Sequence, residues 1–300
     1  MMRLRLADLA DPRLDAFAAE SRAHHATTNG ARGPADLDGL RAMRAQIAAR
    51  PSVADPAART STIDGVPVRI LEPSSGLSRG VYLALHGGGF YLGSAVRNDP
   101  RHRDLAESLD VTVVAPDYRL APEHPWPAAG DDCETVARWL IDHAGAEFGT
   151  DRLIIGGASA GATLALTTLL RLRNHDLSGE YRGAVLTFGT YDISGRTPMG
   201  RAIDDEYFIE AYVGHVDDRS HPDISPVFAD LRGLPPALLT VGADDVVLEH
   251  SLVLAARLTA ARSDVTLNVY PDAPHAFTGA PTAMASAAWD DMYRWIDGLL

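Results

Sequence analysis

A serine flanked by glycines, at the junction of an apolar run and a helical run, is the feature that most limits how this chain can fold. The run Leu153–Ile155 leads into Gly157-Ala158-Ser159-Ala160-Gly161, and Ala162–Leu166 continues with helix-forming residues. A strand that turns this sharply into a helix strains the residue at its apex, and only neighbours with almost no side chain allow it. Ser159 is therefore a candidate nucleophile, although a glycine-flanked serine can also simply fill a loop.

The amino-acid composition excludes several other classes of chemistry. The chain has 300 residues, and 27 basic against 40 acidic side chains give a formal charge of −13. Such a charge repels nucleic acid and anionic lipid surfaces, so we expect no nucleic acid and no membrane as partners. All 27 basic residues are arginine, which rules out Schiff-base catalysis, lysine-anchored pyridoxal phosphate and the Walker A lysine.

The sequence also carries a prediction about location. The first residues include Asp8 and lack the apolar core of a secretory signal, and no apolar stretch is long enough to span a bilayer. Cys133 is the only cysteine, so an internal disulfide cannot form. These features favour a cytoplasmic protein.

Short apolar or β-branched runs alternate with helical stretches along most of the chain, which is the rhythm of a mostly parallel sheet in an α/β fold. Asp64-Gly65 between two further runs predicts a β-hairpin at the start of that sheet. Periodic apolar residues predict helices over 131–143, 160–173, 248–261 and 282–299. The expected strands are 60–63, 66–70, 81–85, 111–115, 153–155, 184–188, 237–241 and 266–270.

Two segments do not follow this rhythm. Residues 1–55 are alanine-rich and helical in pattern, and residues 192–222 carry Tyr207, Phe208 and Tyr212 without a strand pattern. We expect both to cover the carboxyl edge of the sheet, where ligands bind in open α/β folds. The sequence thus predicts an N-terminal helical cap segment over 1–55 and a catalytic domain over 56–300 with a cap insertion near 192–222.

A glycine loop follows the strand expected at 81–85. His86-Gly87-Gly88-Gly89-Phe90 lets main-chain N–H groups point into a cleft without obstruction, as stabilisation of an oxyanion requires. A phosphate-binding nest is the alternative, but the loop lacks a lysine and a G-x-G-x-x-G pattern.

The general base and its acid partner are expected after the last two strands. Asp244 and Asp245 follow the strand at 237–241, and His275 follows the strand at 266–270. The chain order serine, acid, histidine is that of α/β hydrolases. Taken singly, the aspartates could instead cap the next helix, and His275 could be a surface turn residue between prolines.

At these positions the chain resembles the hormone-sensitive lipase family of α/β-hydrolase esterases. The resemblance starts near residue 60 and implies an α/β-hydrolase fold with a mostly parallel central sheet flanked by helices. It further implies a catalytic triad of Ser159, Asp244 and His275 and an oxyanion hole from the N–H groups of Gly87, Gly88 and Ala160. No cofactor or metal is implied. The matching segments are His86-Gly87-Gly88-Gly89, Asp117-Tyr118-Arg119-Leu120-Ala121-Pro122-Glu123, the serine turn, Ser225-Pro226, Leu234-Pro235-Pro236-Ala237 and His275-Ala276-Phe277.

The function expected from these motifs is hydrolysis of small to medium soluble acyl esters through an acyl-enzyme. The family's usual aspartate before the serine is replaced by Ala158, which changes the electrostatics near Ser159. Amide or lactone hydrolysis, acyl transfer in a biosynthetic pathway, and a non-catalytic small-molecule receptor remain alternatives. The strand at 266–270 is a candidate sheet edge for pairing in a homodimer.

Overall fold

An eight-stranded sheet forms the centre of the molecule, as the computed structural model shows for residues 11–27, 33–51 and 53–300. Its strand order is β1-β2-β4-β3-β5-β6-β7-β8. β2 pairs antiparallel with both β1 and β4, and every later pair is parallel. The strands are β1 (Arg59–Ile63), β2 (Val66–Leu71), β3 (Gly80–Leu85), β4 (Val111–Pro116), β5 (Leu153–Ala158), β6 (Tyr181–Thr187), β7 (Ala237–Gly242) and β8 (Val265–Tyr270).

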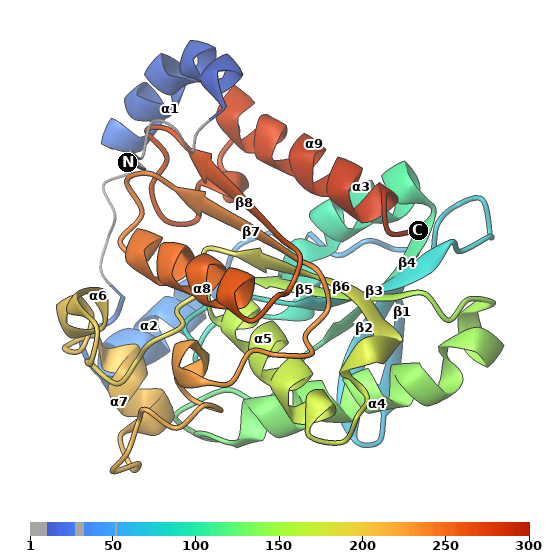
Figure 1. Cartoon of the computed structure of the whole chain (residues 1–300), viewed down its shortest axis with the longest axis horizontal. Helices are drawn as coiled ribbons and strands as arrows, with labels where there is room; N and C mark the ends of the chain where they lie inside the picture. The colour runs from blue at the N-terminus through green and yellow to red at the C-terminus, as the bar shows by residue number, and fades with distance from the viewer. Residues whose placement is uncertain (1–10, 28–32, 52) are drawn as a thin grey trace.

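Helices cover both faces of this sheet (Figure 1). α3 and α9 pack together on one face, whereas α4 and α5 pack together on the other, with α8 against β7 and β8. Among the described residues, none of the helices combines the length and apolar character that crossing a bilayer requires. The helices are α1 (Asp15–Thr27), α2 (Leu37–Ala48), α3 (Asp99–Leu109), α4 (Ala128–Phe148), α5 (Ala160–Arg173), α6 (Pro198–Ala202), α7 (Tyr207–Val213), α8 (Leu248–Ala260) and α9 (Ala283–Asp297).

The central strands are apolar throughout because helices cover both of their faces. In β3 every residue is buried, and successive side chains enter opposite cores. Leu83 and Leu85 join the core that also contains α4 and α5, whereas Tyr82 and Ala84 join the core beneath α3 and α9. Because both of its faces are buried, the sheet is rigid and supports the loops at its carboxyl edge.

The α/β-hydrolase fold expected from the sequence is confirmed. The hairpin is present, with Ile63 opposite Val66, and each expected strand is found with its ends shifted by at most three residues. α5 has the bounds that the apolar periodicity predicts. α3 has no counterpart among the expected helices, because Pro100 stands in its first turn and charged residues dominate the rest of the helix.

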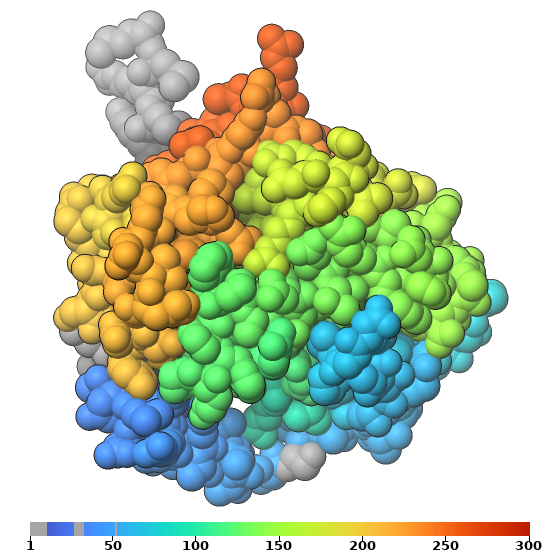
Figure 2. Space-filling model, turned by 90° about the horizontal axis from the view of Figure 1, so that it is seen from below, coloured from blue at the N-terminus to red at the C-terminus, as the bar shows by residue number. Residues whose placement is uncertain are grey.

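The N-terminal helices lie at two different places. α1 packs against α9, whereas α2 lies beside α7 (Figures 1 and 2). The Arg44 guanidinium of α2 donates to the backbone oxygens of Tyr91 and Ala121, in the loops that follow β3 and β4. α2 thus holds the loops after β3 and β4, and α1 holds the loop after β8 through the hydrogen bond from Ser21 to the carbonyl of Asp272. The division into a cap segment over 1–55 and a catalytic domain stays a prediction.

A buried ion pair joins α3 to the sheet. The side chain of Asp99 is fully buried, accepts hydrogen bonds from Arg69 Nε and from the backbone N–H of Asp55, both at 2.8 Å, and so links three segments. We expect Asp99→Ala to lower the free energy of unfolding by about 3–5 kcal/mol, because it leaves the Arg69 charge without its partner.

Urea denaturation of the purified variants measures this effect. Asp104→Ala on the same helix is the matched control, because Asp104 is exposed and its ion pair with Arg101 spans 3.5 Å. Its loss should cost less than about 1 kcal/mol. Equal losses in the two variants would show that the Asp99 pair does not anchor α3.

Candidate active site

The candidate nucleophile stands at a strained turn between β5 and α5. Ser159 has φ 54° and ψ −122°, a backbone conformation that residues with a side chain rarely adopt. A Cβ at Gly161 would overlap the carbonyl oxygen of Leu85, and a Cβ at Gly157 would overlap the backbone of Gly161. The two glycines therefore allow β5, the turn and the start of α5 to pack against the end of β3.

His275 lies against this serine. It comes from the loop between β8 and α9, and its Nε2 is 3.0 Å from the Oγ of Ser159. The ring of Phe188, just past the end of β6, packs edge-on against the imidazole at a centroid separation of 5.0 Å. The serine and the histidine that the sequence analysis singled out are thus in hydrogen-bond contact.

The acid beside His275 is Asp245, and the prediction of Asp244 is wrong. His275 Nδ1 lies 3.0 and 3.1 Å from the two carboxylate oxygens of Asp245, whose side chain is fully buried. Asp244 is exposed, and its backbone N–H donates to the carbonyl of Ala273. Because this bond extends the pairing of β7 with the segment after β8, Asp244 points to solvent and the next residue points inward.

The contact with Asp245 determines which ring nitrogen of His275 can accept a proton. With Nδ1–H donating to Asp245, Nε2 carries a lone pair toward the hydroxyl of Ser159. Asp245 also accepts a hydrogen bond from the backbone N–H of Val247 at 2.9 Å, which fixes its carboxylate. This bond closes a turn before α8, whose N-cap residue is Val247 and has no side-chain capping bond, so the helix-capping alternative for the aspartates is wrong.

The glycine loop after β3 adjoins the serine turn. Gly88 and Gly89 have φ values of 129° and 58°, and the carbonyl of Gly88 accepts from the N–H groups of both Tyr91 and Leu92. An added Cβ on Gly87 would lie 2.7 Å from the carbonyl oxygen of Ala158. The loop thus lies directly against the end of β5.

Four N–H groups at this junction have no acceptor among the described residues. Within the described residues, those of Gly87, Gly88 and Ala160 make no hydrogen bond to a backbone or side-chain acceptor, and the same holds for Gly89. Their assignment to an oxyanion hole stays a prediction, which the proposal below takes up.

A side chain without an expected role, that of Tyr118, holds the glycine loop. The hydroxyl of Tyr118 donates to the carbonyl of His86 at 2.6 Å, and the two rings stack at 4.1 Å. Burial lowers the pKa of His86, so its ring is neutral and stacks without the cost of a buried charge. Tyr118 belongs to the segment 117–123, in which Arg119 pairs with Asp132 and Glu123 pairs with Arg44.

The loop that carries His275 is held from outside by α1. The buried hydroxyl of Ser21 donates to the carbonyl of Asp272 at 2.6 Å, and Arg22 forms an ion pair with the Asp272 carboxylate. Asp272 has a positive φ of 50°, so this contact stabilises an unusual turn three residues before the histidine. No motif pointed to Ser21, because its partner is 251 positions away.

Aromatic side chains of α7 lie over the glycine loop. The ring of Tyr212 stacks on Phe90 at 4.0 Å, and an added Cβ on Gly89 would lie 3.3 Å from the Cβ of Phe208. Tyr207 approaches the ring of Tyr91 with centroids 6.3 Å apart. These contacts bring the insertion next to the residues around Ser159.

Metal-dependent catalysis and a cysteine nucleophile have little support in the described part of the chain. Its His, Cys, Asp and Glu side chains form no group that could hold a metal ion. Cys133 is buried within α4, and burial raises the pKa of its thiol well above the usual range, which disfavours a thiolate nucleophile.

Comparison with known proteins shows the family of this chain. A family model described as the alpha/beta hydrolase fold matches residues 82–279. The chain belongs to the α/β-hydrolase family. It is 30% identical to an arylesterase of Saccharolobus solfataricus over 246 residues, 76% of this chain and 80% of that protein. It is 32% identical to an ethyl acetate hydrolase of Pseudomonas putida over 234 residues, 72% of this chain and 73% of that protein.

Solved structures extend the likeness over the whole length. A hormone-sensitive lipase from a metagenome library superposes with a TM-score of 0.76 at 29% identity, covering 100% of this chain and 99% of that one. The resemblance to hormone-sensitive lipase family esterases, first seen in the motifs, is thereby confirmed.

The contact between Asp245 and His275 leads to a paired test. Asp245→Asn should lower kcat by about 10⁴ for an activated ester, because the imidazole loses the group that sets its tautomer and stabilises its cation. Asp244→Asn, the adjacent control, should retain nearly all activity because its side chain is exposed. Steady-state kinetics with p-nitrophenyl butyrate measures both, and equal losses would mean that the buried contact is not the catalytic one.

Proposed function

We propose that this α/β hydrolase cleaves small to medium soluble carboxylic esters through an acyl-enzyme on Ser159. The observation that carries the proposal is the continuous hydrogen-bonded chain from Ser159 Oγ to His275 Nε2 and from Nδ1 to the buried Asp245. Ester hydrolysis as the reaction rests on the named activities of the relatives. A receptor without catalysis does not require the hydrogen bonds that join Ser159, His275 and Asp245.

The first half-reaction transfers the acyl group to the enzyme. His275 Nε2 takes the hydroxyl proton of Ser159 as the oxygen attacks the ester carbonyl, and Asp245 stabilises the imidazolium that forms. The carbonyl oxygen gains the charge, and we assign its stabilisation to the N–H groups of Gly87, Gly88 and Ala160. When the tetrahedral intermediate collapses, His275 returns the proton to the departing alkoxide, so an alcohol leaves.

The second half-reaction returns the enzyme to its starting state. His275 takes a proton from water, the resulting hydroxide attacks the acyl carbon, and the same N–H groups bind the second oxyanion. Collapse breaks the bond to Ser159 Oγ, which regains its proton from His275, and a carboxylic acid leaves. Ser159, His275, Asp245 and the three backbone N–H groups supply every protein group that these two half-reactions use.

Charge and cap contacts support esters of modest size. The formal charge of −13 opposes binding at an anionic lipid interface. Phe208 lies against the glycine loop, which places an aromatic wall beside the reacting centre. We propose that this wall limits the length of the acyl or alcohol chain that fits.

A panel of p-nitrophenyl esters from acetate to palmitate tests the proposal. The largest kcat/KM should fall on short or medium acyl chains, and palmitate should react negligibly, because a long chain cannot be desolvated in a small cleft. p-Nitroacetanilide, added to the panel, tests amide hydrolysis. Turnover of the anilide with none of the esters would overturn the assignment.

The same panel tests the role of the cap. Phe208→Ala should shift the preference by at least about tenfold toward longer acyl chains, because it removes a wall of the cleft. Phe228→Ala is the control, a half-buried phenylalanine in the short turn Pro226–Phe228. An unchanged length profile for Phe208→Ala would show that the insertion does not select the substrate.

Two further parts of the proposal concern assembly and location. In the described chain β8 is an edge strand paired only with β7, and we propose that two copies pair along it as a homodimer. Light scattering during size-exclusion chromatography distinguishes a monomer from a dimer. A cytoplasmic location is proposed from the sequence.

A further inference from the structure

A cavity of about 350 Å³ lies behind the serine turn, on the face of the sheet covered by α3 and α9. Its inner end is formed by the carboxyl ends of β3 and β5, including Gly157 and Ala158. Neither Ser159 nor His275 lines it. Gly87, whose N–H group is assigned to the oxyanion hole, also lines the cavity, so the cavity adjoins the candidate active site through the backbone of the glycine loop.

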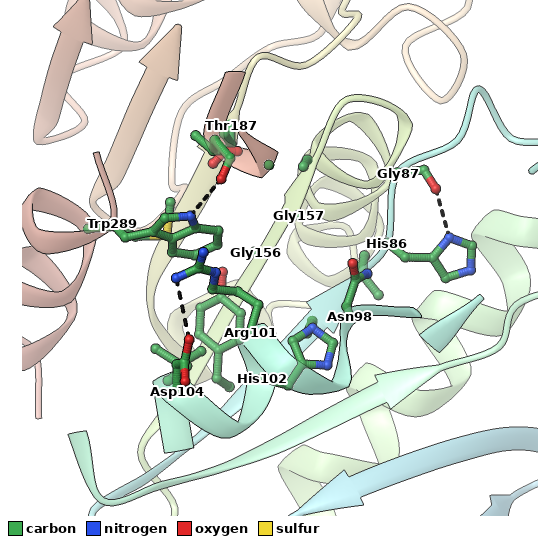
Figure 3. Close-up of a pocket in the computed structure, with 18 of the residues that line it drawn as sticks. His86, Gly87, Asn98, Arg101, His102, Asp104, Gly156, Gly157, Thr187 and Trp289 are labelled. Carbon is green, nitrogen blue, oxygen red and sulfur yellow. Dashed lines mark hydrogen bonds and ion pairs between the residues drawn. The ribbon is translucent and has the colours of Figure 1, made fainter. Parts of the chain in front are cut away.

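Four polar side chains around this cavity have no hydrogen-bonding partner among the described residues. Figure 3 shows three of them, Asn98, His102 and Thr187, drawn with the other residues that line the space. The fourth is Tyr82, whose hydroxyl adjoins Gly156. His102 is only 8% exposed, and its Nδ1 is fully buried without a partner.

Unpaired polar groups in such number need a partner, because each costs free energy if it is left desolvated. Burial lowers the pKa of His102 to about 4, so near neutral pH the ring is uncharged. Its Nδ1 is closed off, which leaves Nε2 as the ring nitrogen that can meet a ligand. Asn98 precedes α3 but makes no capping hydrogen bond with its side chain, so the positive end of this helix also faces the polar part of the cavity. The polar groups thus converge on one space.

Arg101 supplies a cationic group to this cavity. Arg97 and Asp104 also line the space, but the Arg97 guanidinium donates to the backbone oxygens of Ile47 and Pro51. The Arg101 guanidinium lies over the ring of Trp289 at 4.5 Å, opposite His102 and Asn98 in Figure 3. Its ion pair with Asp104 spans 3.5 Å and is exposed, so it leaves most of the donors of Arg101 available.

The remaining walls are apolar and suit a small hydrocarbon body. Leu105, Met292 and the indole of Trp289 enclose the space beside the polar groups. A volume of about 350 Å³ lies at the lower end of the range for sites that hold small molecules. A ligand with one apolar group and one anionic head therefore matches both halves of the cavity.

We propose that this cavity is a second binding site, specific for a small organic monocarboxylate of the size of benzoate. The carboxylate lies toward Arg101, Asn98 and His102, and the apolar part of the ligand lies against Trp289 and Met292. The site does not depend on the proposed esterase activity, although the acid product of an ester belongs to the same chemical class.

Titration of the full-length protein with benzoate at neutral pH tests the proposal. Because Trp289 lines the cavity, we expect a saturable change in tryptophan fluorescence, and calorimetry should give one site per chain with a Kd of about 1 mM or below. Benzamide has the same shape without the charge and should bind at least about tenfold more weakly. Absence of saturable binding, or equal binding of the two probes, would overturn the proposal and leave the cavity to water.

Variants locate the bound carboxylate. Arg101→Gln should weaken benzoate binding about tenfold or more. Arg41→Gln is the matched control, because Arg41 also forms an exposed ion pair with an aspartate three positions away on its helix. His102→Leu should weaken binding without lowering Tm, because it removes a buried polar group that has no partner. Unchanged affinity in Arg101→Gln and His102→Leu would place benzoate elsewhere.

A final arm separates this site from the catalytic cleft. Protein modified on Ser159 with a phosphonate ester, as verified by mass, should bind benzoate with unchanged affinity. Loss of binding after modification would place benzoate in the catalytic cleft and overturn the proposal. If the reagent adds no mass, the proposed esterase mechanism is in doubt, and Arg101→Gln against Arg41→Gln still decides the second site.

Discussion

The close approach of the serine turn to the end of β3 is the steric constraint on which the site depends. Gly157 and Gly161 let the backbone of β5 and α5 pass within contact of the Leu85 and His86 carbonyls, where any side chain would overlap. That packing forces Ser159 into a strained conformation and sets its hydroxyl at the carboxyl edge of the sheet. Because β3 also leads into the glycine loop, the same contact brings the loop and the nucleophile together.

The other parts of the site depend on this frame through loops held by distant residues. Tyr118 holds the glycine loop through the carbonyl of His86, and Ser21 holds the turn before His275 through the carbonyl of Asp272. A backbone carbonyl is a suitable attachment because it fixes the path of the chain without blocking the side chain that reacts. Tyr118 and Ser21, which do not take part in the reaction, therefore set the positions of the glycine loop and of His275.

The sequence predicted the features that depend on residues close together in the chain. The strands, the hairpin and the strained serine follow from apolar runs and from glycines beside Ser159. The choice between Asp244 and Asp245 depends on which of two successive side chains points inward, and the hydrogen bond from Asp244 N–H to Ala273 decides it. Ser21 and the cavity behind the turn escaped notice because they arise where segments distant in sequence meet.

Covalent trapping tests the central claim, that Ser159 is the nucleophile activated by His275 and Asp245. A p-nitrophenyl phosphonate should inactivate the protein with one adduct per chain, and peptide mass spectrometry should find that adduct on the peptide that contains Ser159. The Ser159→Ala variant should neither take up the reagent nor hydrolyse esters, while its Tm stays close to that of the unmodified protein. An adduct on another residue, or ester turnover by Ser159→Ala at the wild-type rate, would contradict the account.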